Sequence, residues 1–349
     1  MTAFVSLKTR LPWTQNPLLV NAPMSGVATG ELATAVTRAG GLGQIGYLDD
    51  MRALSDELDR TRRDLQDIMA TLPDPDQLPI GLGVIVFGSP IEAWMHLFAT
   101  YKPAVAWLSF AGTNTMKDWT ESIRKVAPKT SVWVQLGSVQ AAVDIAQVCH
   151  PDALVLQGSD AGGHGHQNGA SIISLIPETA DELRKQGINI PLIAAGGIMD
   201  GRAAAAALTL GATGLVLGTR FLGAIEAHIP KIYRDAIFRA SDGGQSTVRS
   251  RIFDEIWGPN IWPKTYDGRC LRNKFYEMYT SGKDIVTVRA WLAAAMKGHE
   301  AEGLDVKDMG SLWAGTGVGM VNTLEIAADI VRSIQEETKE HLMKAAALY

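Results

Sequence analysis

The sequence predicts a (β/α)8 TIM barrel that carries a small, mainly helical inserted domain. Eight short apolar runs alternate with segments of helical spacing over roughly 220 residues, which is the size of such a barrel. After Phe221 the alternation stops, and the chain becomes richer in Trp, Arg and charge. A doubly wound open sheet would give the same alternation, but eight units favour the barrel over a sheet of five or six strands.

Each apolar run predicts one barrel strand. The runs are rich in Val, Leu and Ile and contain no charged residue, as expected for parallel strands that are covered on both faces. They are residues 17–24, 41–46, 79–87, 103–110, 131–137, 153–159, 191–197 and 213–219.

The segments between the runs predict the barrel helices. Ser138 and Asp200 stand where an N-cap would begin two of them, and Gly211 stands at the expected end of the second. The last barrel helix is predicted over 323–342, where apolar residues recur at helical spacing. Its predicted stripe is Leu324, Ala327, Ile330, Val331 and Ile334.

This pattern divides the chain into two domains. Residues 1–228 and 316–349 are predicted to form the barrel, and 229–315 to form the helical domain on its substrate side.

The composition is that of a soluble globular protein, and we expect a cytoplasmic one. Apolar residues make up 46% of the 349 residues, charged residues 20%, and the net charge is −5. No basic run suits nucleic acid, and no apolar run reaches the roughly 20 residues that span a bilayer. The two cysteines, Cys149 and Cys270, fit a reducing compartment. Lys8 and Arg10 precede the first acidic residue, Glu31, which leaves an organelle-targeting segment open.

Glycines at two consecutive strand ends predict a phosphate site. The seventh run ends in Gly196 and Gly197, and the eighth in Gly218 and Thr219. In a barrel the loops after strands 7 and 8 often hold a phosphate, and a helix N-terminus after the turn would add partial positive charge. Tight turns between strand and helix also need glycine for purely structural reasons, but two such turns in order favour phosphate binding.

Four stretches together resemble the nitronate monooxygenases. They are APMSGVATGELATAVTRAGGLGQIG, QGSDAGGHGH, IAAGGI and VLGTRF, and AGTGVGMV near the C-terminus is similar too. The resemblance implies a barrel with non-covalent FMN that oxidises alkyl nitronates, and in some members nitroalkanes, with O2 as the electron acceptor. It assigns the FMN phosphate to Gly196, Gly197, Gly218 and Thr219, and the flavin ring to Ala22, Pro23 and Met24.

The glycine-rich loop after the sixth run supplies the candidate base. His164 matches the histidine of the family's AGGH stretch, and an imidazole suits removal of the acidic C–H proton of a nitroalkane. His166 is expected to brace the loop, and Asp160 to face the cofactor or to bond its own turn. A metal site of these three residues is not expected, because the scaffold is flexible and no second carboxylate follows. The glycines expected to approach the flavin are Gly158, Gly162 and Gly163.

Several polar residues remain open in role. Gln135 ends the fifth run and is expected to face the polar edge of the flavin, although a neighbouring loop could equally satisfy its amide. Arg269 and Arg272 either meet an anionic substrate or brace the inserted domain. Trp313 either covers the flavin pocket or packs at the barrel mouth.

The expected partners are a nitronate or nitroalkane and O2, with a homodimer as one compatible assembly. An NAD(P)H-dependent reductase of the enoyl-thioester type on the same FMN barrel is the main alternative function. A flavin-free phosphate-binding barrel is another, but no strand run offers it a lysine or a carboxylate. A non-catalytic binding protein has no distinctive support.

Overall fold

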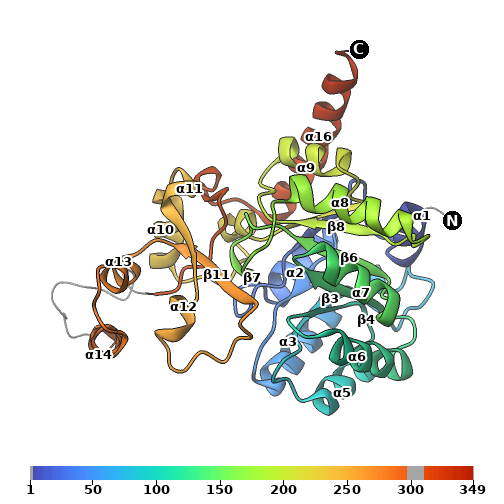
Figure 1. Ribbon diagram of the computed structural model, residues 1–349. Coiled ribbons are helices and arrows are strands. Elements are labelled where there is room, and N and C mark those ends of the chain that lie inside the picture. The colour runs from blue at the N-terminus through green and yellow to red at the C-terminus, as the bar shows by residue number, and fades with distance from the viewer. Residues whose placement is uncertain (1–2, 297–309, 349) are drawn as a thin grey trace.

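The computed structural model describes residues 3–296 and 310–348, and its centre is a barrel of eight parallel strands (Figure 1). The strands pair in the order β1-β9-β8-β6-β5-β4-β3-β2, and a parallel bridge between Val20 and Leu42 joins the two outermost strands. Each predicted run coincides with one strand to within a few residues, which confirms the TIM-barrel fold. The strands are β1 (Leu19–Asn21), β2 (Gln44–Ile45), β3 (Leu78–Ile85), β4 (Pro103–Ser109), β5 (Ser131–Leu136), β6 (Ala153–Gln157), β8 (Leu192–Ala195) and β9 (Gly214–Leu217).

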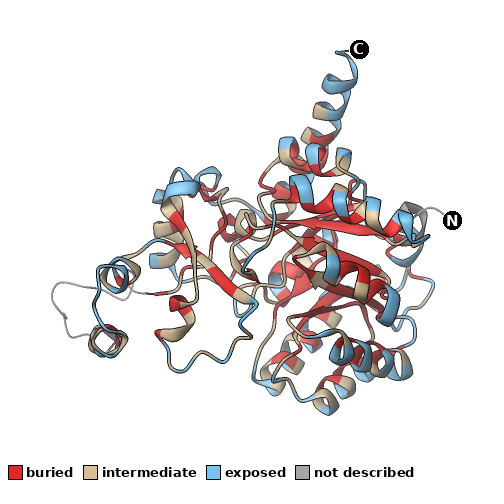
Figure 2. Ribbon diagram, viewed as in Figure 1, coloured by how far each residue is buried: buried red, intermediate tan, exposed pale blue. Residues whose placement is uncertain are grey.

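Alternation along the strands separates two apolar cores. Trp107 and Trp133 belong to a buried cluster of strand side chains that fills the barrel. Their neighbours Leu108 and Val134 belong to a second cluster, shared with the helices outside. Successive residues of a strand point to opposite faces, so apolar residues at every position serve both cores. Figure 2 shows that buried residues concentrate in these strands.

The helices of the outer wall begin where their caps predict. Ser138 accepts the N–H of Ala141 at 3.4 Å at the start of α7, and Asp200 accepts that of Arg202 at 3.0 Å at the start of α9. The helices of this part are α1 (Ala3–Arg10), α2 (Gly30–Arg38), α3 (Met51–Asp64), α4 (Gln66–Met69), α5 (Ile91–Tyr101), α6 (Thr113–Val126), α7 (Val139–Cys149), α8 (Ile172–Lys185), α9 (Gly201–Thr209) and α16 (Ala327–Ala346), with short 3-10 turns η1 (Thr219–Gly223) and η2 (Val318–Met320).

The last helix begins later than the sequence predicts. Leu324 precedes α16 and is 47% exposed, so its place in the apolar stripe was wrong. The reason is a tertiary contact: the Glu325 N–H donates to Gly223 at 2.9 Å, and Ile225 donates back to Glu325 at 2.8 Å. This pairing holds the segment extended. The rest of the stripe is buried, namely Ala327, Ile330, Val331 and Ile334.

The inserted segment contains a small sheet that the sequence did not predict. Strand β11 pairs antiparallel with β10 and with β7 (Gly163–His166), which lies in the loop after β6. The other regular elements in the described part of the segment are helices, and the segment stands beside the barrel (Figure 1). Its elements are α10 (Lys231–Arg239), α11 (Gly243–Ser246), β10 (Thr247–Ser250), α12 (Ile252–Glu255), β11 (Tyr266–Leu271), α13 (Lys274–Thr280) and α14 (Ile285–Met296).

The barrel and the inserted segment share apolar packing. One buried cluster joins Met199 and Leu222 of the barrel to Ile237 and Leu312 of the segment. The exact boundaries at 228/229 and 315/316 therefore stay a prediction. No helix within the described ranges combines the length and the apolar composition needed to cross a membrane.

Candidate active site

A cavity of about 750 Å³ lies where the ends of the barrel strands meet the inserted segment. Its volume is typical of ligand and cofactor pockets, which measure roughly 300 to 1,000 Å³. Within the described part of the chain, no Lys, Arg, Asp or Glu lines it. The predicted site residues that line it are Ala22, Pro23, Met24, Gln135, Gly162, Gly163, His164, Gly196, Gly197, Gly218 and Thr219.

The glycine turns after β8 and β9 line the cavity and contain hydrogen-bond donors left unpaired by the described part of the chain. Gly196 and Gly197 have φ angles of 105° and 74°, which only glycine adopts readily. Among the described residues, the N–H groups of Gly197, Gly218 and Thr219 have no acceptor. The Thr219 hydroxyl accepts the N–H of Gly315 at 2.9 Å, so its own proton can be donated elsewhere. Such donors can bind an anion.

The helix after β8 does not add the N–H groups that the sequence suggested. The N–H of Gly201 donates to the Glu337 carboxylate at 3.0 Å. Asp200 accepts those of Arg202 and Ala203 at 3.0 and 3.3 Å. Because side chains of the protein already occupy this end of α9, an anion at the cavity depends on the glycine turns instead.

His164 lies on a strand rather than in a flexible loop. It stands opposite Gly268 in the antiparallel pairing of β7 with β11. A Cβ at Gly268 would come within 2.2 Å of the Trp313 ring, so glycine is needed for that ring to approach. The Trp313 and His164 ring centroids are 4.6 Å apart. The pairing satisfies the backbone of the GHGH stretch, which explains why a glycine-rich sequence is ordered here.

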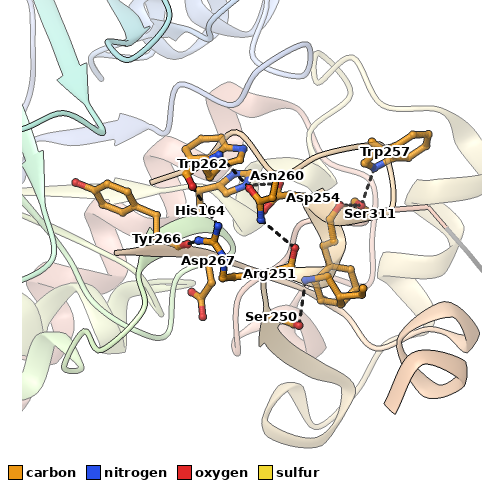
Figure 3. Close-up of polar contacts among 12 residues, drawn as sticks. His164, Ser250, Arg251, Asp254, Trp257, Asn260, Trp262, Tyr266, Asp267 and Ser311 are labelled. Carbon is orange, nitrogen blue, oxygen red and sulfur yellow. Dashed lines mark hydrogen bonds and ion pairs between the residues drawn. The ribbon is translucent and has the colours of Figure 1, made fainter. Parts of the chain in front are cut away.

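The His164 imidazole contacts a carboxylate from the inserted segment. Its Nε2 lies 2.7 Å from Oδ1 of Asp254, which belongs to α12 (Figure 3). The two side chains are only 15% and 10% exposed. Their contact joins the barrel loop to the inserted segment at the cavity.

Aromatic rings surround the imidazole. Trp262 stacks on His164 with centroids 3.5 Å apart and an angle of 9° between the planes. Arg251 holds that tryptophan by donating to its carbonyl at 3.1 Å, and Asn260 accepts its N–H at 2.9 Å. Phe110 meets the edge of the stack with φ at 64°, a strained conformation for a bulky residue. Such strain is often found at functional sites.

Gln135 takes part in a chain of amides at the cavity wall. Its Oε1 accepts from the Trp107 indole at 3.0 Å, and its Nε2 donates to Gln157 at 2.9 Å. Gln157 in turn donates to the carbonyl of His164 at 3.0 Å. Neighbouring side chains thus bond both ends of the Gln135 amide, and the chain also supports the backbone at His164.

Two predicted cofactor residues are not among the residues that line the cavity. Gly158 donates its N–H to Ala195 at 2.8 Å, and a Cβ there would meet Ile172 at 2.7 Å. Asp160 accepts from the Thr316 hydroxyl at 3.2 Å, and its carbonyl accepts the Thr316 N–H at 3.0 Å. These contacts hold the AGTGVG stretch against the loop after β6.

The remaining polar candidates also lie outside the cavity lining. His166 accepts the N–H of Asn168 at 3.2 Å on its Nδ1. Arg269 donates to the carbonyl of Ser159 at 3.1 Å, and burial lowers the pKa of its guanidinium. Arg272 lies over the Tyr276 ring at 5.6 Å. Neither arginine lines the cavity, so the choice between substrate contact and bracing stays a prediction for both.

Comparison with known proteins shows the family of the chain. The family model described as nitronate monooxygenase matches residues 7–337. The chain belongs to the nitronate monooxygenase family. A nitronate monooxygenase of Metarhizium robertsii is 37% identical over 352 residues, with 98% of this chain and 96% of that protein covered. One from Neurospora crassa is 34% identical over 372 residues, covering 99% and 95%. Among solved structures, FabK from Thermotoga maritima has a TM-score of 0.72 at 26% identity and covers 98% of both chains.

For this member of the nitronate monooxygenase family, sequence reasoning missed three residues around His164. They are Phe110, Asp254 and Trp262. Phe110 ended a predicted strand, and its position at a strand end was a usable signal. Asp254 and Trp262 lie in the inserted segment, where the richness in Trp was visible but no spacing related it to the GHGH stretch.

Proposed function

We propose that this chain oxidises alkyl nitronates, and nitroalkanes after loss of a proton, with O2 and with FMN bound in the cavity. Membership of the nitronate monooxygenase family supports the substrate class. The observation that carries the proposal is the position of His164, whose imidazole lines the cavity. Within the described chain, that cavity is mostly apolar and is lined by no lysine, arginine or carboxylate. A neutral nitroalkane suits such a wall, and a protonated His164 would offset the single charge of a nitronate.

The cavity fits FMN in size and in the kind of groups it offers. Gly197, Gly218 and Thr219 would hold the phosphate through donors that have no acceptor within the described chain, and the positive φ of Gly196 would let the turn approach it. The flavin ring would lie along Ala22, Pro23 and Met24. When bound, FMN supplies the electron transfer from the nitronate to O2.

The residues of the chain would move one proton and exclude water. His164 would accept the proton from the carbon beside the nitro group and would then, as a cation, stabilise the nitronate electrostatically. Trp262, Trp313 and Phe110 would keep water from this carbon, because their rings surround the imidazole. A nitronate supplied as such needs no proton transfer.

The test is oxygen uptake by the purified protein with ethylnitronate and with nitroethane. We expect uptake with both, faster with the nitronate. A second measurement mixes the protein with NADH without oxygen, because rapid bleaching of the flavin would favour the reductase alternative. Absence of uptake on ethylnitronate would refute the proposal, and bleaching by NADH would then support the reductase alternative.

A further inference from the structure

The pairing of Asp254 with His164 fixes which imidazole nitrogen carries a proton. An ionised carboxylate can only accept a hydrogen bond. Across the 2.7 Å contact, an ionised Asp254 therefore makes Nε2 of His164 the donor to Oδ1. In a neutral imidazole one nitrogen donates and the other accepts. Nδ1 is then the nitrogen with a free electron pair, and it is the one able to take up a proton.

Trp262 and Asp254 restrict the imidazole in two different ways. The indole lies parallel to the ring at 3.5 Å and so fixes the plane of the imidazole. A rotation of the ring by half a turn about the Cβ–Cγ bond would keep the stack but would exchange the positions of nitrogen and carbon. Such a turn would remove Nε2 from the Asp254 carboxylate. The carboxylate thus selects one of two orientations that the stack allows.

The packing around Asp254 does not explain why a carboxylate stands at this position. Its Oδ2 is buried and has no hydrogen-bond partner among the described residues, which opposes folding. Its neighbours Ile252, Phe253 and Ile256 belong to a buried apolar cluster and anchor α12 without it. A buried group with an unpaired atom calls for a functional explanation, and His164 is the residue that its side chain contacts.

We propose that Asp254 is a positioning residue that makes Nδ1 of His164 the atom that accepts the substrate proton. This inference rests on the proposed function. In the step, the C–H bond beside the nitro group breaks, and its electron pair stays on the substrate as a nitronate. The proton forms an N–H bond at Nδ1, and no oxidant is needed. The resulting imidazolium then faces a carboxylate of opposite charge at Nε2. Oxidation of a preformed nitronate does not need this step.

The first experiment compares Asp254→Asn with the wild-type holoenzyme on nitroethane and on ethylnitronate. An amide has no full negative charge and can present its N–H to Nε2, which would leave the proton on Nδ1. We expect kcat on nitroethane to fall by about 100-fold or more, the usual range for loss of general base catalysis, while kcat on ethylnitronate stays near the wild-type value. The ratio of the two rates is the readout, because a merely structural defect lowers both.

Asp235→Asn is the matched control. It makes the same change in the inserted segment, where Asp235 pairs with Lys231 on α10 at 2.6 Å; its side chain is 38% exposed and does not line the cavity. Both rates should stay at the wild-type value. An equal fall on both substrates in Asp254→Asn, or no fall on either, would overturn the inference. So would a wild-type enzyme that oxidises nitronates but no nitroalkane, and that result would leave only the nitronate part of the proposed function standing.

A second measurement needs no variant of Asp254. Long-range 15N–1H NMR of the labelled holoprotein reports the tautomer of each histidine, and His164→Ala identifies the signal of His164 by its loss. We expect a protonated Nε2 and an unprotonated Nδ1 for the neutral ring. The opposite tautomer would overturn the inference even if nitronate oxidation is observed. Conversely, absence of nitronate oxidation would refute the proposed function whatever the tautomer.

Discussion

A charge placed at Gly218 tests whether the turn after β9 binds the FMN phosphate. Gly218 has a φ of −99°, which any residue can adopt. A Cβ there would lie 3.4 Å from that of Ala22 and 3.9 Å from the Met24 sulfur, which is ordinary van der Waals contact. Gly197 is a poorer choice, because its φ is 74° and a Cβ would approach Asp160 to 3.2 Å. Gly218→Asp should therefore fold, and Gly218→Asn differs from it only in charge.

The expected size of the effect follows from Coulomb's law. Two unit charges 4 to 8 Å apart repel by about 4 to 2 kcal/mol at an effective dielectric constant of about 20. This corresponds to FMN binding that is roughly 700- to 30-fold weaker in Gly218→Asp than in Gly218→Asn. Where solvent reaches the turn, high salt should weaken this repulsion between the introduced carboxylate and the phosphate.

The assay titrates the flavin-free variants with FMN and, separately, with riboflavin. Riboflavin lacks the phosphate, so its affinity should be similar in the two variants. Circular dichroism and urea unfolding check that both fold. Equal affinity of the two folded variants for FMN would refute the assignment of the phosphate to this turn. An equal loss for riboflavin would refute it too, because the cause would then lie at the ring.

Three further predictions concern the base and the fold. His164→Ala should keep FMN but lose nitroalkane turnover by about 100- to 10,000-fold, with a smaller loss on nitronates in oxygen uptake; unchanged nitroalkane turnover would remove it from the mechanism. Gly43→Ala should lower the free energy of unfolding in a urea titration by about 1 to 3 kcal/mol or more, because the new Cβ would lie 1.9 Å from a backbone carbonyl of α2. Gly112→Ala is the control: its Cβ would meet open space, so the free energy of unfolding should stay unchanged. Asp267→Asn should cost up to about 3 kcal/mol, because it leaves Arg249, whose side chain is only 13% exposed, without its ion pair; an unshifted urea midpoint would contradict this.

The barrel could be predicted because its signals are local. Each strand is a short apolar run, and caps such as Ser138 and Asp200 act within three residues. The start of α16 could not be predicted, because Glu325 is held extended by the Gly223 carbonyl, which is far away in the sequence. The pairing of β7 with β11 was equally hidden, since the GHGH stretch has no apolar alternation.

In the candidate site, too, the residues with local signals could be predicted and the others could not. Glycines at strand ends could be placed at one rim, because in a parallel barrel all strand ends meet there. The partners of His164 could not be found in this way. Asp254 follows it by 90 positions and lies on a helix of four residues, in a segment that carries no repeat or motif. Only the folded chain brings its carboxylate to the imidazole.

The visible absorption spectrum of the purified protein tests the central claim most directly. The account predicts a flavin spectrum, FMN in the supernatant after denaturation, and loss of the flavin absorbance when ethylnitronate is added without oxygen. A colourless protein that takes up no FMN, or a bound flavin whose spectrum ethylnitronate leaves unchanged, would contradict it.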